Sequence, residues 1–260
     1  MVFSLYQHRS LIWQHALADI RYRYAGSGMG VVWNVLHPLA MIVLYSVVFT
    51  AIMEAHVAPE LGRFGFPLYL CAGFFPWIAF SDSLNRGATA FTANASYLKK
   101  LPVPEQVFVA QAIASATLSL FISFAILIVV ALCLGLPPRT TWLLLPLPML
   151  LLQIMGLGLG MAIGTINVFF PDVSQILAIV LQVMFWLTPI VYAREALPQL
   201  SGIIPFHPLT PALDAIRSLF LDGRAPAQAT WWAMSAWAGG SLMLGVLVLR
   251  ALRSEIRDVL

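Results

Sequence analysis

Six long apolar runs set the pattern of hydrophobic and polar positions along this chain. They cover about residues 31–53, 67–91, 107–136, 142–168, 176–192 and 230–249. A helix rises about 1.5 Å per residue and the apolar layer of a bilayer is about 30 Å thick, so one span needs about 20 residues. Because a helix satisfies its own backbone in lipid, the pattern predicts an all-α integral membrane protein with six transmembrane helices. No long polar segment separates the runs, so residues 1–260 are predicted to form one membrane domain.

Residues 1–28, ahead of the first run, have the pattern of an amphipathic helix. Ile12, Ala16 and Ile20 recur at intervals of four and share one helical face, while Asp19 and Arg23 share another. The segment is therefore predicted to lie along the membrane interface.

Residues 194–227, between the fifth and sixth runs, contain apolar stretches too short to cross a membrane and several prolines. We predict short helices that dip into the outer face of the membrane, with Asp214 and Arg217 on the polar side of one helix. An ordinary external loop is the alternative.

The composition, 60% hydrophobic and 10% charged, excludes an ordinary soluble domain. More Lys and Arg fall on the side of the two termini than on the opposite side, which predicts that both termini are cytoplasmic. The net charge of +3 is spread along the chain without a basic stripe, so a nucleic-acid partner is not expected.

The segment NASYLKKLPVPEQ, residues 94–106, holds the only two lysines of the chain. We predict a short helix, stopped and stiffened by prolines, that forms a rigid basic knob between the second and third spans. In this interpretation Asn94 caps the helix, and four side chains project from it. The residues concerned are Asn94, Tyr97, Leu98, Lys99, Lys100, Pro102 and Pro104. Such a knob could transmit force to the flanking spans; alternatively, the lysines only mark the cytoplasmic side.

Asp82 and Arg86 lie four residues apart inside the second predicted span, so each can neutralise the other. A structural ion pair is the favoured interpretation, and a pair that helps to translocate a substrate is the alternative. Gly156, Gly160 and Gly164 recur at intervals of four in the fourth span, a spacing that predicts close contact between helix backbones.

The chain contains none of the motifs GxSxG, HExxH and GxxxxGK[ST], and its histidines form no cluster. We therefore expect a transport subunit rather than an enzyme, with no catalytic residue and no metal or cofactor of its own. If ATP drives it, a separate subunit must bind ATP and magnesium.

Four stretches of the chain resemble the permease subunits of ABC-2 type polysaccharide exporters, the O-antigen and teichoic acid export family. These stretches are RYRYAGSGMGVVWNVLHPL, NASYLKKLPVPEQ, GTINVFFPDVSQILAIVLQVMFWLTPIVY and HPLTPALDAIRSLFLDG. The resemblance implies a homodimer in the bacterial inner membrane, bound to two copies of an ATP-binding cassette subunit. It also implies undecaprenyl-diphosphate-linked polysaccharide as the substrate, with membrane lipids as further partners.

The resemblance further implies that residues 94–106 form the coupling helix that docks in the ATPase, and that spans one and five line the channel. Aromatic side chains on those spans could stack on sugar rings, although lipid contact or core packing would also explain them. The candidates are Trp33, Tyr45, Phe185, Trp186 and Tyr192.

The same resemblance implies that the external helices of residues 194–227 close the outer mouth of the channel. Thr188 and Pro189 are expected to bend span five there, and Pro208 and Arg217 belong to the same gate. Two positions depart from the family pattern: Pro171 stands where an arginine is usual before Asp172, and His207 replaces an asparagine before Pro208. The alternative function is an ion-coupled lipid or glycolipid flippase.

Overall fold

The computed structural model describes residues 2–23, 26, 28–51, 64–100, 102–192 and 207–259. Within these ranges the chain is helical and has no strand, which confirms the predicted all-α class. Its α-helices are α1 (Val2–Gln7), α2 (Arg9–Tyr22), α3 (Trp33–Ala51), α4 (Gly65–Ala93), α5 (Ala95–Lys100), α6 (Gln106–Cys133), α7 (Pro146–Phe169), α8 (Val173–Leu187), α9 (Thr210–Arg217) and α10 (Gln228–Val259). Short 3₁₀ helices, η1 (Gly30–Val32) and η3 (Thr140–Leu144), precede α3 and α7, and a π-helical turn, η7 (Ser218–Asp222), follows α9.

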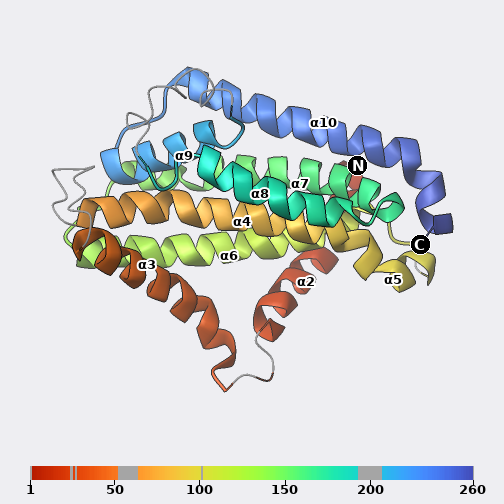
Figure 1. Ribbon diagram of the computed structural model, residues 1–260, viewed down its shortest axis with the longest axis horizontal. Helices are drawn as coiled ribbons and strands as arrows, with labels where there is room; N and C mark the ends of the chain where they lie inside the picture. The colour runs from red at the N-terminus through yellow and green to blue at the C-terminus, as the bar shows by residue number, and fades with distance from the viewer. Residues whose placement is uncertain are drawn as a thin grey trace.

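The long helices α4, α6, α7 and α10 run side by side and form the body of the molecule (Figure 1). Helices α8 and α9 pack on α4 and α7, and α2 and α3 slant away from the body and approach each other at their far ends. Both termini lie at the end of the body that carries α5, whereas α9 lies near the opposite end. This arrangement agrees with an even number of crossings.

Three helical segments of the described chain are long and apolar enough to cross a membrane. They are Gln106–Cys133, Thr140–Phe169 and Gln228–Ile256, and shorter apolar helices cover Trp33–Val48 and Val173–Leu187. Helix α4 has 29 residues but mixes apolar side chains with polar ones such as Asp82 and Arg86. The predicted fifth span ends earlier than expected, at Leu187, whereas the sixth continues beyond its apolar run to Val259.

Glycines bring the backbones of the body helices into contact. A Cβ on Gly87 of α4 would lie 2.7 Å from the Cα atom of Gly160, and a Cβ on Gly158 would lie 2.3 Å from the backbone of Ser241 in α10. A side chain at these positions would force the helices apart, so the close packing predicted from the glycine spacing is confirmed. Gly87, on the partner helix, is the contact that the spacing alone could not identify.

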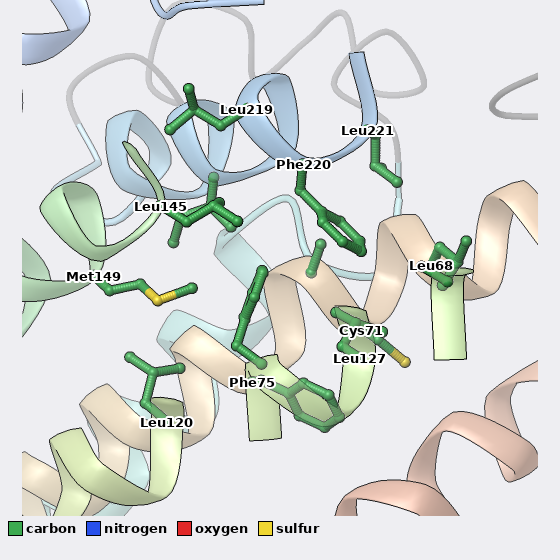
Figure 2. Packing of buried hydrophobic residues seen from close by; sticks show 14 of the residues in the cluster. Leu68, Cys71, Phe75, Leu120, Leu127, Leu145, Met149, Leu219, Phe220 and Leu221 are labelled. Atoms are coloured by element: carbon green, nitrogen blue, oxygen red, sulfur yellow. The ribbon is translucent and has the colours of Figure 1, made fainter. Parts of the chain in front are cut away.

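A hydrophobic cluster ties η7 to the body (Figure 2). Phe220 packs edge-on against Phe124 of α6 at 5.4 Å between ring centroids, and its carbonyl accepts a hydrogen bond of 3.0 Å from Trp142 Nε1. The side chains of Leu219, Phe220 and Leu221 are buried. An ordinary external loop is therefore the wrong description of residues 210–222, while the earlier part of the predicted gate, residues 194–206, lies outside the described residues.

Candidate functional site

Helix α5 forms the tip between α4 and α6 at the end of the molecule where the termini lie. Tyr97 is 58% exposed, and Lys99 and Lys100 are exposed in the last turn. Pro102 is also exposed and Pro104 is half-buried. The helix ends at Lys100, before the two prolines, as predicted.

Two details of the predicted knob are wrong. Leu98 does not project from α5; its side chain is fully buried in a cluster that includes Phe91 of α4 and Ile256 of α10. Asn94 does not cap α5 with its side chain, since Nδ2 donates a hydrogen bond of 2.8 Å to the Ala90 carbonyl near the end of α4. The exposed part of the knob is thus an aromatic ring and two ammonium groups on a buried leucine base.

The segment after α5 is bound to other parts of the chain. Glu105 is almost completely buried, and its Oε2 accepts a hydrogen bond of 2.9 Å from Arg253 Nε in α10. The next residue, Gln106, donates from Nε2 to the Ser4 hydroxyl of α1 at 3.2 Å. The amino end of α6 is therefore hydrogen-bonded both to α1, near the amino terminus, and to α10, near the carboxyl terminus.

The predicted ion pair between Asp82 and Arg86 is confirmed, with 3.7 Å between Nη1 and Oδ2, but it belongs to a larger cluster. Arg86 Nη1 lies closer, at 2.9 Å, to Oδ2 of Asp19 in α2. Arg23 lies 3.1 Å from Asp19 and 3.9 Å from Asp82. Two carboxylates and two guanidinium groups thus bind α2 to α4.

The electrostatics of this cluster favour the charged form of Asp19. Partial burial alone would raise the pKa of Asp19, but hydrogen bonds and charge from Arg86 and Arg23 outweigh that effect and leave the pKa below its usual value. The interface helix is therefore attached by an ionised carboxylate, a contact for which the pattern of residues 1–28 gave no signal.

Two of the channel candidates meet through an aromatic residue of α4. Phe74 lies 5.1 Å from Tyr45 of α3 and 6.2 Å from Phe185 of α8, measured between ring centroids. Phe185 also lies 5.7 Å from Trp77 and 5.4 Å from Trp186. We name these five residues the aromatic row. Phe74 and Trp77 were missed because no feature of the second apolar run singles them out.

Two channel candidates, Trp33 and Tyr192, lie outside the aromatic row. Trp33 is the first residue of α3 and is 37% exposed, and Trp186 has the most exposed side chain of the aromatic row at 63%. The Tyr192 hydroxyl lies 3.0 Å and 3.1 Å from the carbonyls of Trp186 and Leu187, where it can cap the end of α8.

Thr188 and Pro189 do not form a hinge within a helix, because α8 ends at Leu187. Thr188 is extended and buried, and its hydroxyl donates to the Met184 carbonyl at 2.6 Å. Proline has no backbone N–H to continue the helix, so the chain leaves α8 at this point.

Arg217 binds the end of α8 from within the body. Its Nη1 donates to the Pro189 carbonyl at 2.6 Å and to the Tyr69 hydroxyl at 2.9 Å, and its Nη2 donates to the Ile190 carbonyl at 3.0 Å. The guanidinium also stacks on the Tyr69 ring, with 3.6 Å from Cζ to the ring centroid. Arg217 thus joins α9, α4 and the end of α8.

The prediction that Arg217 lies on the polar side of its helix is wrong, because its side chain is buried. The space for it comes from Gly73 of α4, where a Cβ would lie 2.5 Å from Arg217 Nη2. His207, by contrast, lies near Thr188, with 3.4 Å between Nε2 and Oγ1, and burial lowers its pKa. Pro208, the next residue, is half-buried.

The short turn between α7 and α8 contains Pro171 and Asp172, both exposed. A hydrogen bond from the Ser174 backbone N–H to Asn167 Oδ1, 3.0 Å long, and another from the Ser174 hydroxyl to the Pro171 carbonyl hold it. In the part of the chain that the structure describes, no group of three metal-ligating side chains comes together.

Comparison with known proteins bears on this arrangement. A family model described as ABC-2 type transporter matches residues 9–221. An O-antigen export system permease of Klebsiella pneumoniae is 28% identical over 79% of this chain and 78% of its own length. An O-antigen export system permease of Myxococcus xanthus is 26% identical over 93% of this chain and 94% of its own length.

A polysialic acid transport protein of Escherichia coli is 25% identical over 80% of both chains. The matched residues 9–221 run from α2 through α5 and the aromatic row to η7. The chain therefore belongs to the ABC-2 type transporter family.

Proposed function

We propose that this chain is the membrane subunit of an ATP-driven exporter that moves a lipid-linked polysaccharide out of the cytoplasm. The observation that carries the proposal is the similarity, over most of the chain, to permeases whose names state O-antigen export and polysialic acid transport. The chain has no P-loop of its own. A separate ATP-binding subunit therefore supplies the energy and binds ATP and magnesium.

Helix α5 is the proposed contact with that subunit. It is a short, stiff element with Tyr97, Lys99 and Lys100 exposed, and its buried Leu98 anchors it to the body. An acidic groove in the partner would complement the two ammonium groups. Because α5 follows α4 directly and leads into α6, a push on α5 reaches both helices.

The aromatic row is the proposed contact with the polysaccharide. Aromatic faces can stack on sugar rings without binding their hydroxyls, so a long chain can slide past them. The row spans α3, α4 and α8, and α3 and α8 both carry exposed apolar faces. In a homodimer of this chain, these faces would enclose the path. The complex, with two copies of the ATPase, belongs in the bacterial inner membrane, both termini on the cytoplasmic side.

The test is export by the permease and its ATPase, purified together and reconstituted in vesicles. Lys99→Glu with Lys100→Glu should lower ATP-driven export about tenfold, since two cations of the docking contact become anions. Arg224→Glu, a single charge reversal at an exposed position away from α5, serves as the control.

Export that is unchanged by the double substitution would contradict the role of α5. Export that needs no ATP, stops with a proton uncoupler and is abolished by Asp82→Asn would instead support the ion-coupled flippase. The bonds of Asp82 to Arg86 and Arg23 favour a structural role for that carboxylate.

A further inference from the structure

The end of α10 shares a buried hydrophobic cluster with α5. Leu249, Arg253 and Ile256 follow one another at intervals of four and three, so they share one face of α10. Leu249 and Ile256 are buried in the same hydrophobic cluster as Leu98 of α5. This face of α10 and Leu98 of α5 therefore contribute to one buried cluster.

Arg253 adds a directed bond to this packing. Its Nε donates to Glu105 Oε2 at 2.9 Å, and Glu105, in the link between α5 and α6, is only 1% exposed on its side chain. A hydrogen bond to a buried carboxylate is strong, because little water competes for the carboxylate oxygens. The Arg253 side chain nevertheless stays 57% exposed.

Nearer its middle, α10 also contacts α7 in the body of the molecule. A Cβ on Gly245 of α10 would lie within 3.0 Å of the backbone carbonyl carbon of Gly158 in α7, so the two backbones touch. Gly160 and Gly164 of α7 touch Gly87 of α4 in the same way. Close-packed helices transmit displacement instead of absorbing it. A displacement of α5 that reaches α10 would thus also reach α7.

We propose that α5 and the end of α10 form one docking unit for the ATP-binding partner, in which the bond between Arg253 and Glu105 makes α10 move with α5. This inference rests on the proposed function. It adds a second route, through α10 and α7, by which a displacement of α5 by the ATP-binding partner reaches the body. Arg253 is a positioning residue in this unit.

The experiment measures substrate exported per ATP hydrolysed, in vesicles that contain the complete complex. Arg253→Ala should lower this ratio about fivefold, the low end of typical coupling between sites, while the ATPase still turns over. Arg253→Lys should restore most of the ratio, because an ammonium group can also bind Glu105. Arg250→Ala removes an exposed cation that does not share the face of Leu249 and Ile256, and it should stay within about twofold of wild type.

Glu105→Gln separates the bond from any other role of Arg253. If the bond is the link, Glu105→Gln lowers the ratio, and combining it with Arg253→Ala lowers it no further. A loss of folded protein would reduce export and hydrolysis together and leave the ratio unchanged.

A wild-type ratio in Arg253→Ala overturns the inference, and so do fully additive effects in the double variant. If the wild-type complex exports with ATP, and only the lysine substitutions in α5 lower the ratio of export to hydrolysis, the inference fails while the proposed function stands. If the wild-type complex shows no ATP-dependent export, the proposed function fails and takes the inference with it.

Discussion

Gly73 and Arg217 share one space inside the body. The guanidinium of Arg217 lies where a side chain on Gly73 would be, and it binds the carbonyls of Pro189 and Ile190, which follow the end of α8. These carbonyls are buried beyond the last helical residue, so water cannot easily satisfy them. A single arginine thus fixes where the end of α8 lies against α4.

We predict that Gly73→Ala destabilises the protein. The added Cβ would lie 2.5 Å from Arg217 Nη2, so the guanidinium must move and lose hydrogen bonds, at a cost of about 1–3 kcal/mol. Thermal unfolding in detergent measures the change. Gly239→Ala is the control, because a Cβ there meets nothing within 4 Å; equal unfolding temperatures for the two variants would contradict the prediction.

At the level of single residues, the sequence indicated which side chains are important better than it indicated whether they are buried or exposed. It singled out Lys99, Lys100 and Arg217, but it placed Arg217 at a polar surface. Leu98 is buried in a cluster that includes Ile256 of α10, and Arg217 is bonded to Tyr69 of α4; both residues are distant along the chain. Helical periodicity describes only the residue's own helix, so it could not predict these contacts.

At the level of elements, α2 is attached to α4 by charge as well as by packing. Ala16 and Ile20 are buried, as the amphipathic pattern predicts. Asp19, on the polar face, pairs with Arg86 rather than with lipid head groups alone. The interface helix is therefore fixed to the helix that continues into α5.

This attachment should weaken in acid. The pKa of Asp19 is below its ordinary value of 3.8, so its contribution is complete above about pH 4 and is lost as the pH falls through the lower, folded value. A spin label at the exposed Gln14 should become more mobile over that range. In Asp19→Asn the label should be mobile at every pH, and a pH response that persists in this variant would assign the effect to another group.

The limits of the fifth span show why element ends were hard to predict. Apolar residues continue from α8 through Ile190 and Val191, so hydropathy alone extends the helix to Tyr192. Pro189 stops it, and Arg217 from a distant helix stabilises the exit. The bodies of α6, α7 and α10, in contrast, followed from hydropathy because nothing interrupts their runs.

For the whole molecule, the arrangement predicts which segments meet which side of the membrane. With Cys71 and Cys133 replaced by serine, a cysteine in place of Tyr97 should react with an impermeant maleimide only in inside-out vesicles. A cysteine at the exposed Ala225, near the opposite end, should react only in right-side-out vesicles. Labelling of both from the same side would contradict the topology.

The glycine contact between α4 and α7 makes α4 a lever with an off-centre fulcrum. Gly87, where the two backbones touch, lies about 9 Å from the end of α4 that leads into α5 and about 33 Å from the other end. A tilt about this point would enlarge a displacement at the α5 end roughly three- to fourfold at the far end. The far arm carries Phe74 of the aromatic row and Tyr69, the partner of Arg217. An ångström of travel at the short arm would thus become several ångströms beside the end of α8.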